Sequence, residues 1–276
     1  MGKIISKRLG RKLEAYDIWY DGFKPRSNLD ETKLDAQIQK LYPNAEAFKA
    51  GLPALLTHLG FTPERANEIC DKIAVDAARG SGHAWGAAMK GQQSHLRTRI
   101  PAEGMNYKGY NIAVHEFGHN VEQTISMYNV DNFMMAGVPN TAFTEALAFV
   151  FQKRDLKLLG IENNDPEADK MDILDKFWSL YEIMGVSMLD ISIWEWLYAN
   201  PDATADQLRE ATISLSKEIW NKYYAPVFGK KDETVLAIYS HMISYPLYLS
   251  AYAFGQIILV TKTSHKKSTA SIVWDA

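Results

Sequence analysis

The sequence predicts a mainly α-helical protein with a small β-sheet. Apolar residues recur three and four positions apart along most of the chain, which is the spacing of one face of an α-helix. Two short segments, 95–100 and 104–109, have the pattern of strands bounded by turns, so the sheet should be small. With 276 residues, 47% of them hydrophobic, the chain can bury a sizeable core of one or two domains.

The expected elements follow from local signals along the chain. The predicted helices are Asp30–Leu41, Pro63–Ala78, a helix around 112–123, a run from Ala142 to a stop at Gly160, Met171–Met184, Val186–Ala199, and a helix from the capping box at Thr204 and Gln207 to Tyr224. The predicted strands are 95–100 and 104–109. Asp232 should open a last helix that carries His241, and Pro246 should bend that helix. We expect an irregular connector at 1–29 and a flexible polar tail at 261–276.

The pentapeptide His115-Glu116-Phe117-Gly118-His119 is the most informative motif. Residues four apart share a helix face, so the imidazoles of His115 and His119 can bind one metal ion. Glu116 adjoins the first histidine and can reach a water molecule on that metal. Such a site lowers the pKa of the water to about 7 and supplies a nucleophile at neutral pH. The motif indicates a zinc hydrolase, and the alternative is an ordinary helix that carries two histidines.

The third protein ligand distinguishes the classes of zinc peptidase. A metzincin would place histidine at position 125, which is Ile125, and the shorter glutamate spacings fall on Val138 and Pro139. The first suitable glutamate is Glu145, 26 residues past His119 in a strongly helical run. Two helices packed side by side would bring this glutamate to the two histidines, so we favour it as the third ligand.

Two alternatives to this ligand set stay open. Glu122 is a rival ligand, but it lies on the same helix as His119 and completes a tetrahedron less well. Glu145 would otherwise be a carboxylate in the first turn of its helix, stabilised by the helix dipole.

The motif with its distant glutamate resembles the thimet oligopeptidase and oligoendopeptidase F family of zinc peptidases, which are gluzincins. A tyrosine-rich segment at 241–255 supports the resemblance, because Tyr245 and Tyr252 keep the interval of seven residues that the family has. His241 precedes Tyr245 by four residues, one fewer than in thimet oligopeptidase. The resemblance implies a zincin-like catalytic core, with Tyr245 and Tyr252 donating hydrogen bonds to the oxyanion and His241 assisting. Otherwise these tyrosines form an aromatic face of a core helix.

A weaker resemblance concerns the segment Gly80–Gly86, which is similar to the edge strand before the metal helix of the family. Such a strand suits an extended peptide, which would add to the sheet by β-augmentation. His83 and His95 are more simply explained as hydrogen-bonded loop histidines than as ligands. The resemblance covers about residues 75–260, whereas members of the family are commonly much longer, so a compact relative and a fragment both fit.

These features predict zinc-dependent hydrolysis of peptide bonds in oligopeptides by a single catalytic core, residues 1–276. His115, His119 and Glu145 would hold Zn²⁺, and Glu116 would take a proton from water and pass it to the leaving amine. The alternative is a non-catalytic or truncated zinc-peptidase-like module that binds metal and peptides without turnover. The sequence leaves cleavage specificity and oligomeric state open.

Charge and cysteine content narrow the partners and the location. A net charge of −3 and a pI near 6.2 argue against nucleic acid or a membrane surface as the main partner. The single cysteine, Cys70, suits a reducing compartment, and the N-terminus has no apolar stretch long enough for a signal peptide. The longest uncharged run, 245–260, is too short to span a membrane. We therefore expect a cytoplasmic protein that acts on a peptide substrate.

Overall fold

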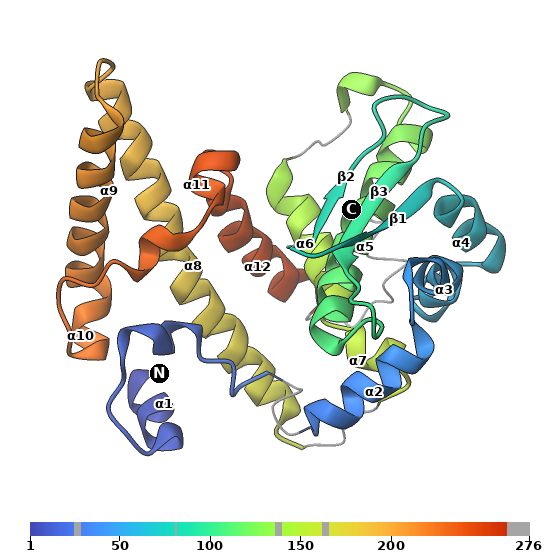
Figure 1. Cartoon of the computed structure of the whole chain (residues 1–276), viewed down its shortest axis with the longest axis horizontal. Helices are drawn as coiled ribbons and strands as arrows, with labels where there is room; N and C mark the ends of the chain where they lie inside the picture. Colours follow the sequence, from blue (N-terminus) through green and yellow to red (C-terminus); the bar gives the residue numbers. More distant parts are fainter. Residues whose placement is uncertain (25–28, 81, 136–139, 162–165, 264–276) are drawn as a thin grey trace. The chain divides into compact units, whose positions relative to one another are not determined.

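The structure, a computed structural model, describes residues 1–24, 29–80, 82–135, 140–161 and 166–263. It confirms the predicted fold class, since helices predominate and a three-stranded sheet accompanies them (Figure 1). The chain divides into two compact units, which we describe separately. Unit 1 comprises Met1–Ser27 and Asn164–Phe254, and unit 2 comprises Asn28–Asn163 and Gly255–Ala276. The expectation of one catalytic core stays a prediction.

Unit 2 contains the sheet and the pentapeptide motif. Its elements in chain order are α2 (Glu31–Leu41), α3 (Ala45–His58), α4 (Pro63–Cys70), β1 (Ile73–Ala78), β2 (His83–Trp85), β3 (Ser94–Arg99), α5 (Tyr107–Asn129), η3 (Phe133–Met135), α6 (Thr141–Gln152), α7 (Asp155–Leu158) and most of α12 (Leu249–Thr263). Strand β3 is central, parallel to β1 and antiparallel to β2. Strand β2 therefore lies at an edge of the sheet, as the family resemblance of the segment 80–86 implied.

Helix α5 is the element on which the packing of unit 2 depends. Asn106 caps its first turn, because the side chain of Asn106 accepts a hydrogen bond from the backbone N–H of Gly109. The helix is tied to the sheet by the hydroxyl of Thr98, which donates to the carbonyl of Gly109 at 2.8 Å. Its apolar face enters the main core of the unit through Tyr110, Ala113, Val114, Phe117 and Val121.

Some predictions of local structure in unit 2 were wrong. Residues 63–78 form α4 and then β1, because Ile73–Ala78 pairs in register with β3. Residues 104–109 form no strand, since α5 begins at Tyr107. The helix expected from Ala142 to Gly160 is divided between Gln152 and Asp155 into α6 and α7. A short apolar run in the sequence fits a strand and a helix equally well, so the pairing partner decides.

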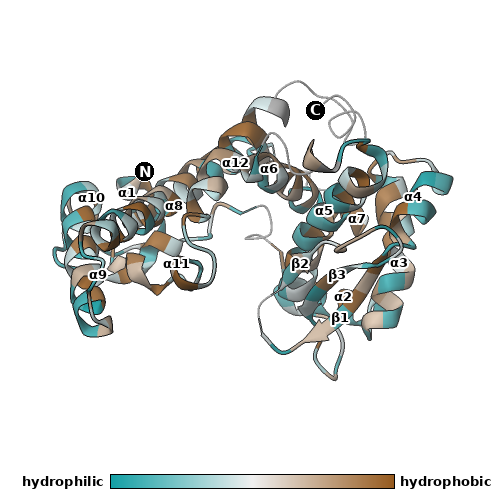
Figure 2. Cartoon of the chain, turned by 90° about the horizontal axis from the view of Figure 1, so that it is seen from above, coloured by the Kyte–Doolittle hydropathy of each residue, from teal (hydrophilic) through white to brown (hydrophobic). Residues whose placement is uncertain are grey.

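Unit 1 consists of helices and helical turns in its described part. They are α1 (Gly2–Leu9), η1 (Ala15–Trp19), α8 (Ala168–Ala199), α9 (Ala205–Ile219), the π-helical turn η4 (Trp220–Tyr224), α10 (Ala225–Phe228), η5 (Val235–Ile238), α11 (His241–Ser244) and the first residues of α12. Figure 2 shows hydrophobic and hydrophilic residues interleaved along α8 and α9. The largest buried side chains of its core are aromatic: Phe23, Trp178, Trp220, Tyr224 and Phe228.

Helix α8 joins the two helices predicted at 171–184 and 186–199. A Cβ atom at Gly185 would lie 2.0 Å from the hydroxyl oxygen of Tyr224, so the glycine leaves room for this tyrosine without ending the helix. The predicted capping box at the start of α9 is confirmed. Residues 1–29, expected to be irregular, contain α1 and η1, which are anchored by the buried side chains of Ile5 and Ile18.

The C-terminal part departs from the prediction in one respect. Asp232 opens no long helix, because its φ of 62° does not fit an α-helix, and the chain forms η5 and the short α11 instead. Pro246 separates α11 from α12. Of the tail expected at 261–276, residues up to Thr263 continue α12, and the others lie outside the described residues. In the part of the chain that the structure describes, no helix is both long and apolar enough to cross a membrane.

Candidate metal centre

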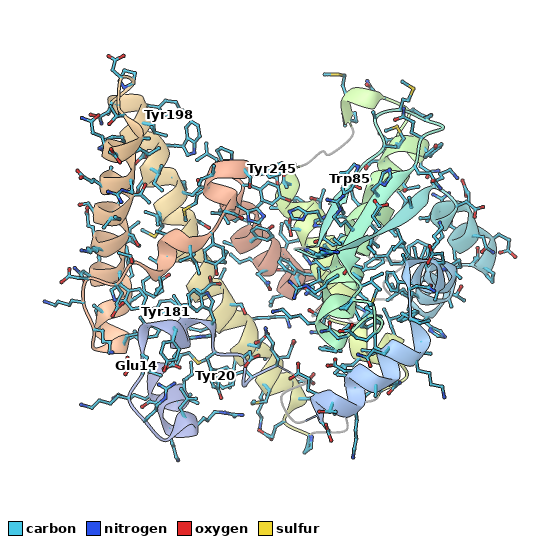
Figure 3. All side chains as sticks on the ribbon, viewed as in Figure 1. Glu14, Tyr20, Trp85, Tyr181, Tyr198 and Tyr245 are labelled. Carbon is cyan, nitrogen blue, oxygen red and sulfur yellow. The ribbon has the colours of Figure 1, made fainter. Side chains whose placement is uncertain are left out.

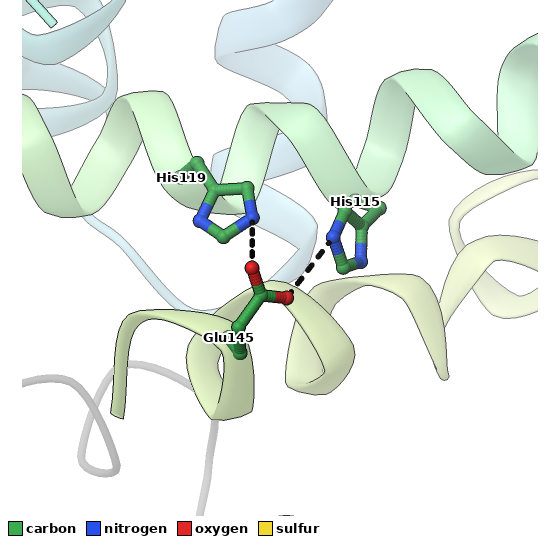
Figure 4. Close-up of side chains that lie close together, drawn as sticks. All are labelled: His115, His119 and Glu145. Carbon is green, nitrogen blue, oxygen red and sulfur yellow. Dashed lines mark ion pairs between the residues drawn. The ribbon is translucent and has the colours of Figure 1, made fainter. Parts of the chain in front are cut away.

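Three side chains from α5 and α6 converge in unit 2 (Figure 4). The Nε2 atoms of His115 and His119 each lie 3.5 Å from an oxygen of the Glu145 carboxylate, one on Oε2 and the other on Oε1. The ligand atoms of all three residues lie within 4.8 Å of one another. The structure thus brings together the three predicted ligands in a cluster that could hold a metal ion.

The spacing of the cluster can be compared with what a metal requires. Two ligand atoms at about 2.1 Å from a tetrahedral zinc ion lie about 3.4 Å apart. The two nitrogen–oxygen distances of 3.5 Å agree with this value and are long for direct hydrogen bonds. Two imidazole nitrogens and one carboxylate are also a donor set that zinc hydrolases use. The residues therefore fit a divalent ion.

Glycine contacts fix the position of α6, which carries Glu145. A Cβ atom at Gly118, inside the motif, would lie 2.7 Å from the Cα of Ala148, so only glycine allows α5 and α6 to approach this closely. A Cβ atom at Gly255 of α12 would lie 2.9 Å from the Cβ of Glu145. Asn140 caps the start of α6 by accepting the N–H of Ala142 at 2.9 Å. The Glu145 side chain is completely buried as a result.

The two histidines differ in their electrostatic environment. Burial lowers the pKa of His119 to about 4, because the charged imidazolium loses its hydration. Burial acts on His115 in the same direction, but its interactions with the nearby Glu145 carboxylate outweigh it, and the pKa of His115 is raised. His119 therefore stays neutral near pH 7 and keeps a nitrogen lone pair for a metal.

Glu116 lies on the side of the motif helix α5 that faces the edge strand β2. Burial raises the pKa of its carboxyl group, opposed by the nearby imidazoles of His115 and His83 and by the backbone N–H of Ala84 in β2. The chain before β2 passes close to it, since a Cβ atom at Gly82 would lie 3.5 Å from Glu116 Cγ. A partly buried carboxylate with a raised pKa is suited to accept and return a proton.

A chain of hydrogen bonds behind His115 was missed from the sequence. His115 Nδ1 lies 3.2 Å from Gln152 Oε1, and Gln152 Nε2 donates to Asn111 Oδ1 at 2.8 Å. Asn111 Nδ2 in turn donates to the buried carboxylate of Asp155 at 2.6 Å, and the hydroxyl of Tyr107 donates to the same oxygen. The one signal in the sequence is spacing, because Asn111 and His115 are four apart in α5.

The direction of this chain determines the tautomer of His115. The Asp155 carboxylate only accepts, so the amide groups of Asn111 and Gln152 are oriented with their donors toward it. The oxygen of Gln152 therefore faces His115, whose Nδ1 must carry the proton. The Nε2 lone pair is then left for the metal, and the imidazole ring is held in orientation by its outer partner.

We expect Gln152→Ala to weaken zinc binding by about 10–100-fold, the usual cost of losing an outer partner of a ligand histidine. Competition with a chromophoric zinc chelator measures this affinity. Gln152→Glu keeps an acceptor for His115 and should retain more affinity than the alanine variant. Gln92→Ala, at an exposed amide, is the control and should bind zinc like the unmodified protein. Equal affinity in Gln152→Ala and this control would show that the hydrogen-bond chain does not orient His115.

The other candidate residues lie apart from the three ligands in the described structure. Glu122, the rival ligand, accepts a hydrogen bond from the Ser126 hydroxyl at 2.5 Å and is no member of the cluster. His83 and His95 lie on β2 and β3 rather than in loops, and His95 Nδ1 is 2.8 Å from an oxygen of Asp76. Val138 and Pro139 lie outside the described residues.

The predicted tyrosines belong to unit 1 and form an aromatic group there. His241 Nε2 lies 3.3 Å from the hydroxyl oxygen of Tyr252, and the ring of Tyr248 packs against both residues. Tyr245, labelled in Figure 3, follows α11 and is 60% exposed. The part that Tyr245, Tyr252 and His241 take in a reaction stays a prediction.

Comparisons with known proteins bear on the fold. A scan against protein families and a search of curated proteins find no match. Among solved structures, the crystal structure of a "putative oligoendopeptidase F" from Bacillus anthracis str. Ames is similar, with a TM-score of 0.50 and 15% sequence identity. The match covers 99% of this chain and 51% of that chain, so this chain spans about half the length of its structural neighbour. At this identity the likeness shows the fold alone, and the fold is the mainly α, zincin-like one that the sequence predicted.

Proposed function

We propose that this protein hydrolyses peptide bonds in oligopeptides, with zinc as its cofactor. The observation that carries the proposal is the geometry of one site, in which two imidazole nitrogens each lie 3.5 Å from an oxygen of one buried carboxylate and Glu116 adjoins the first histidine. The fold likeness to a protein named as an oligoendopeptidase supports the same reaction class.

The proposed mechanism assigns a separate task to each side chain. A zinc ion on His115, His119 and Glu145 would lower the pKa of a water molecule to about 7 and polarise the substrate carbonyl. Glu116 takes the proton of the attacking water and passes it to the leaving amine. The backbone N–H of Ala84 faces the Glu116 carboxylate and keeps it beside the edge strand.

The edge strand β2 supplies a binding surface for an extended substrate. It pairs with β3 on one side, and no described strand pairs with its other side. A peptide that adds to this free edge would receive backbone hydrogen bonds that do not depend on its sequence. Because Gly82 and Ala84 lie beside Glu116, a peptide bound there passes close to the general base.

Tyr245 and Tyr252 are proposed as donors to the oxyanion, with His241 assisting. This role is carried over from the resemblance to the oligopeptidase family. One feature is in keeping with it, since the hydroxyl of Tyr252 is within hydrogen-bond distance of His241. One hydrogen-bond donor of an oxyanion hole stabilises a transition state by about 2.7–4 kcal/mol, and a phenol aimed at the developing negative charge can serve as such a donor.

Removal and return of the metal test the proposal. We expect equilibrium dialysis to show one zinc ion per chain, and no binding in His119→Ala. Zinc-loaded protein should cleave members of a mixed short-peptide library, read by mass spectrometry. Dialysis against a chelator should abolish the products, and zinc should restore them.

The alternative predicted from the sequence is a module that binds metal and peptides without turnover. Stoichiometric zinc together with peptide binding, but with no product at any zinc concentration, would favour this alternative. An absence of stoichiometric zinc would contradict both functions, because each depends on the same three ligands.

A further inference from the structure

A cavity of about 410 Å³ lies beyond the end of β2 in unit 2. One wall is the segment 86–90, which continues the edge strand. The other wall is the last two turns of α5 with the residues that follow, from Glu122 to Asp131. The segment is held to the helix by the Tyr128 hydroxyl, which accepts the N–H of Gly91 at 2.9 Å. None of the three metal ligands or Glu116 lines the cavity.

The edge strand runs from beside Glu116 to the wall of the cavity. Strand β2 and helix α5 run alongside each other in the same direction, because Gly82 lies beside Glu116 and Gly86 lies beside Gln123. Seven residues of helix, from Glu116 to Gln123, span about 10 Å. An extended peptide covers that distance in about three residues. A peptide on the free edge of β2 thus reaches the cavity a few residues from the bond that is cut.

The lining of the cavity suits a long side chain with a positive end. Its apolar members can contact an aliphatic stem, and they are Ala87, Ala88, Met89, Met127 and Val130. Its charged members are the carboxylates of Glu122 and Asp131 against the single ammonium of Lys90. The balance of charge on the walls is therefore negative.

Of the two carboxylates that line the cavity, Glu122 is the partly buried one and Asp131 is exposed. The Glu122 side chain is partly buried, and burial raises the pKa of its carboxyl group. The Ser126 hydroxyl donates to one of its oxygens at 2.5 Å. Within the described ranges, no lysine or arginine forms an ion pair with it, and the ammonium of Lys90 is instead 6.0 Å from the centre of the Tyr128 ring. A bound guanidinium or ammonium would compensate the partly buried charge.

We propose that this cavity is a specificity subsite that takes a lysine or arginine side chain of the peptide substrate, with Glu122 as its anionic partner. The proposal rests on the proposed peptidase function for its peptide ligand. It adds a substrate class, peptides with a basic residue a few positions from the scissile bond. It also gives a role to a glutamate that does not bind the metal.

Matched peptides test the subsite. A series carries arginine, or its neutral isostere citrulline, at each of the two to four positions on either side of the cleaved bond. We expect kcat/KM for the arginine peptide to exceed that for its citrulline partner about tenfold at one position. The arginine-to-citrulline ratio should fall close to one in Glu122→Gln. In Glu122→Lys, a peptide with glutamate at that position should be cleaved with a higher kcat/KM than the arginine peptide. Glu103→Gln, at an exposed carboxylate outside the cavity, should keep the ratio of the unmodified protein.

Binding measurements separate this proposal from the proposed function. The same peptides, labelled with a fluorophore, are titrated with zinc-loaded Glu116→Gln and followed by anisotropy. Suppose that the unmodified protein cleaves no peptide, but Glu116→Gln binds the arginine peptide more tightly than the citrulline peptide and loses this preference when Glu122→Gln is added. The subsite is then supported and turnover is refuted. If peptides are cleaved without preference for arginine, or the preference survives in Glu122→Gln, the subsite is refuted and turnover stands. An absence of any peptide binding would overturn the subsite as well.

Discussion

Replacing Glu116 with glutamine should reduce peptide turnover by about 10²–10⁴-fold while zinc stays bound, because the variant loses only proton transfer. Glutamine keeps the volume of the side chain and an oxygen that can face the N–H of Ala84, so the contact with β2 survives. It cannot take a proton from water at neutral pH. The measurement is kcat/KM on a peptide that the unmodified protein cleaves, with zinc content determined on the same preparation.

The control for this experiment is Glu103→Gln, which makes the same chemical change at an exposed position. Its turnover should match that of the unmodified protein. If Glu116→Gln keeps full activity, Glu116 is not the general base and the mechanism fails. If zinc is lost together with activity, Glu116 supports the metal site, and its effect on turnover is indirect.

Replacing Glu145 with glutamine should weaken zinc binding by at least about 100-fold, beyond what an outer partner contributes. The change is nearly isosteric and removes the one anionic ligand of the cluster. A metal that binds only the folded protein stabilises it by about 2.7 kcal/mol at 100 times its dissociation constant. We therefore expect zinc to raise the midpoint of thermal unfolding of the unmodified protein and to raise that of Glu145→Gln much less.

The quantity that tests whether Glu145 is a ligand is the rise in the unfolding midpoint caused by zinc, rather than the midpoint itself. A glutamine at this fully buried position also changes the stability of the metal-free protein. This change is present both with and without zinc, so it cancels when the two midpoints of one variant are subtracted. Glu122→Gln is the matched control and should keep the full increment, since Glu122 lies outside the cluster. An equal increment in all three proteins would mean that Glu145 is not a zinc ligand.

The cluster of His115, His119 and Glu145 was largely predictable because helix geometry links spacing in the sequence to position in space. His115 and His119 are one turn apart whatever the rest of the chain does. Glu145 was harder, since its contact with them depends on how α5 and α6 pack. It was found by excluding the shorter spacings and by the helical run around it. What the sequence did not show is that Gly118, within the motif, sets how closely the two helices approach.

The errors arose where a distant partner decides the local structure. The apolar residues after Cys70 fit the period of α4, and only pairing with β3 makes Ile73–Ala78 a strand. The hydrogen-bond chain from His115 to Asp155 was missed for a similar reason. Amide side chains such as those of Asn111 and Gln152 have no signature in a single sequence, and only the packing of α5 against α6 and α7 brings them together.

The close glycine contacts of α6 have a consequence for which acidic residue can serve as the third ligand. Aspartate is one methylene shorter than glutamate, and a helix that was free to slide could move inward to make up the difference. Helix α6 has no such freedom toward α5, because the backbone of Ala148 already meets the position of a Cβ atom at Gly118. Gly255 likewise leaves no space beside Glu145. The separation of the backbones thus selects glutamate over aspartate at position 145, and the two acids are not interchangeable there.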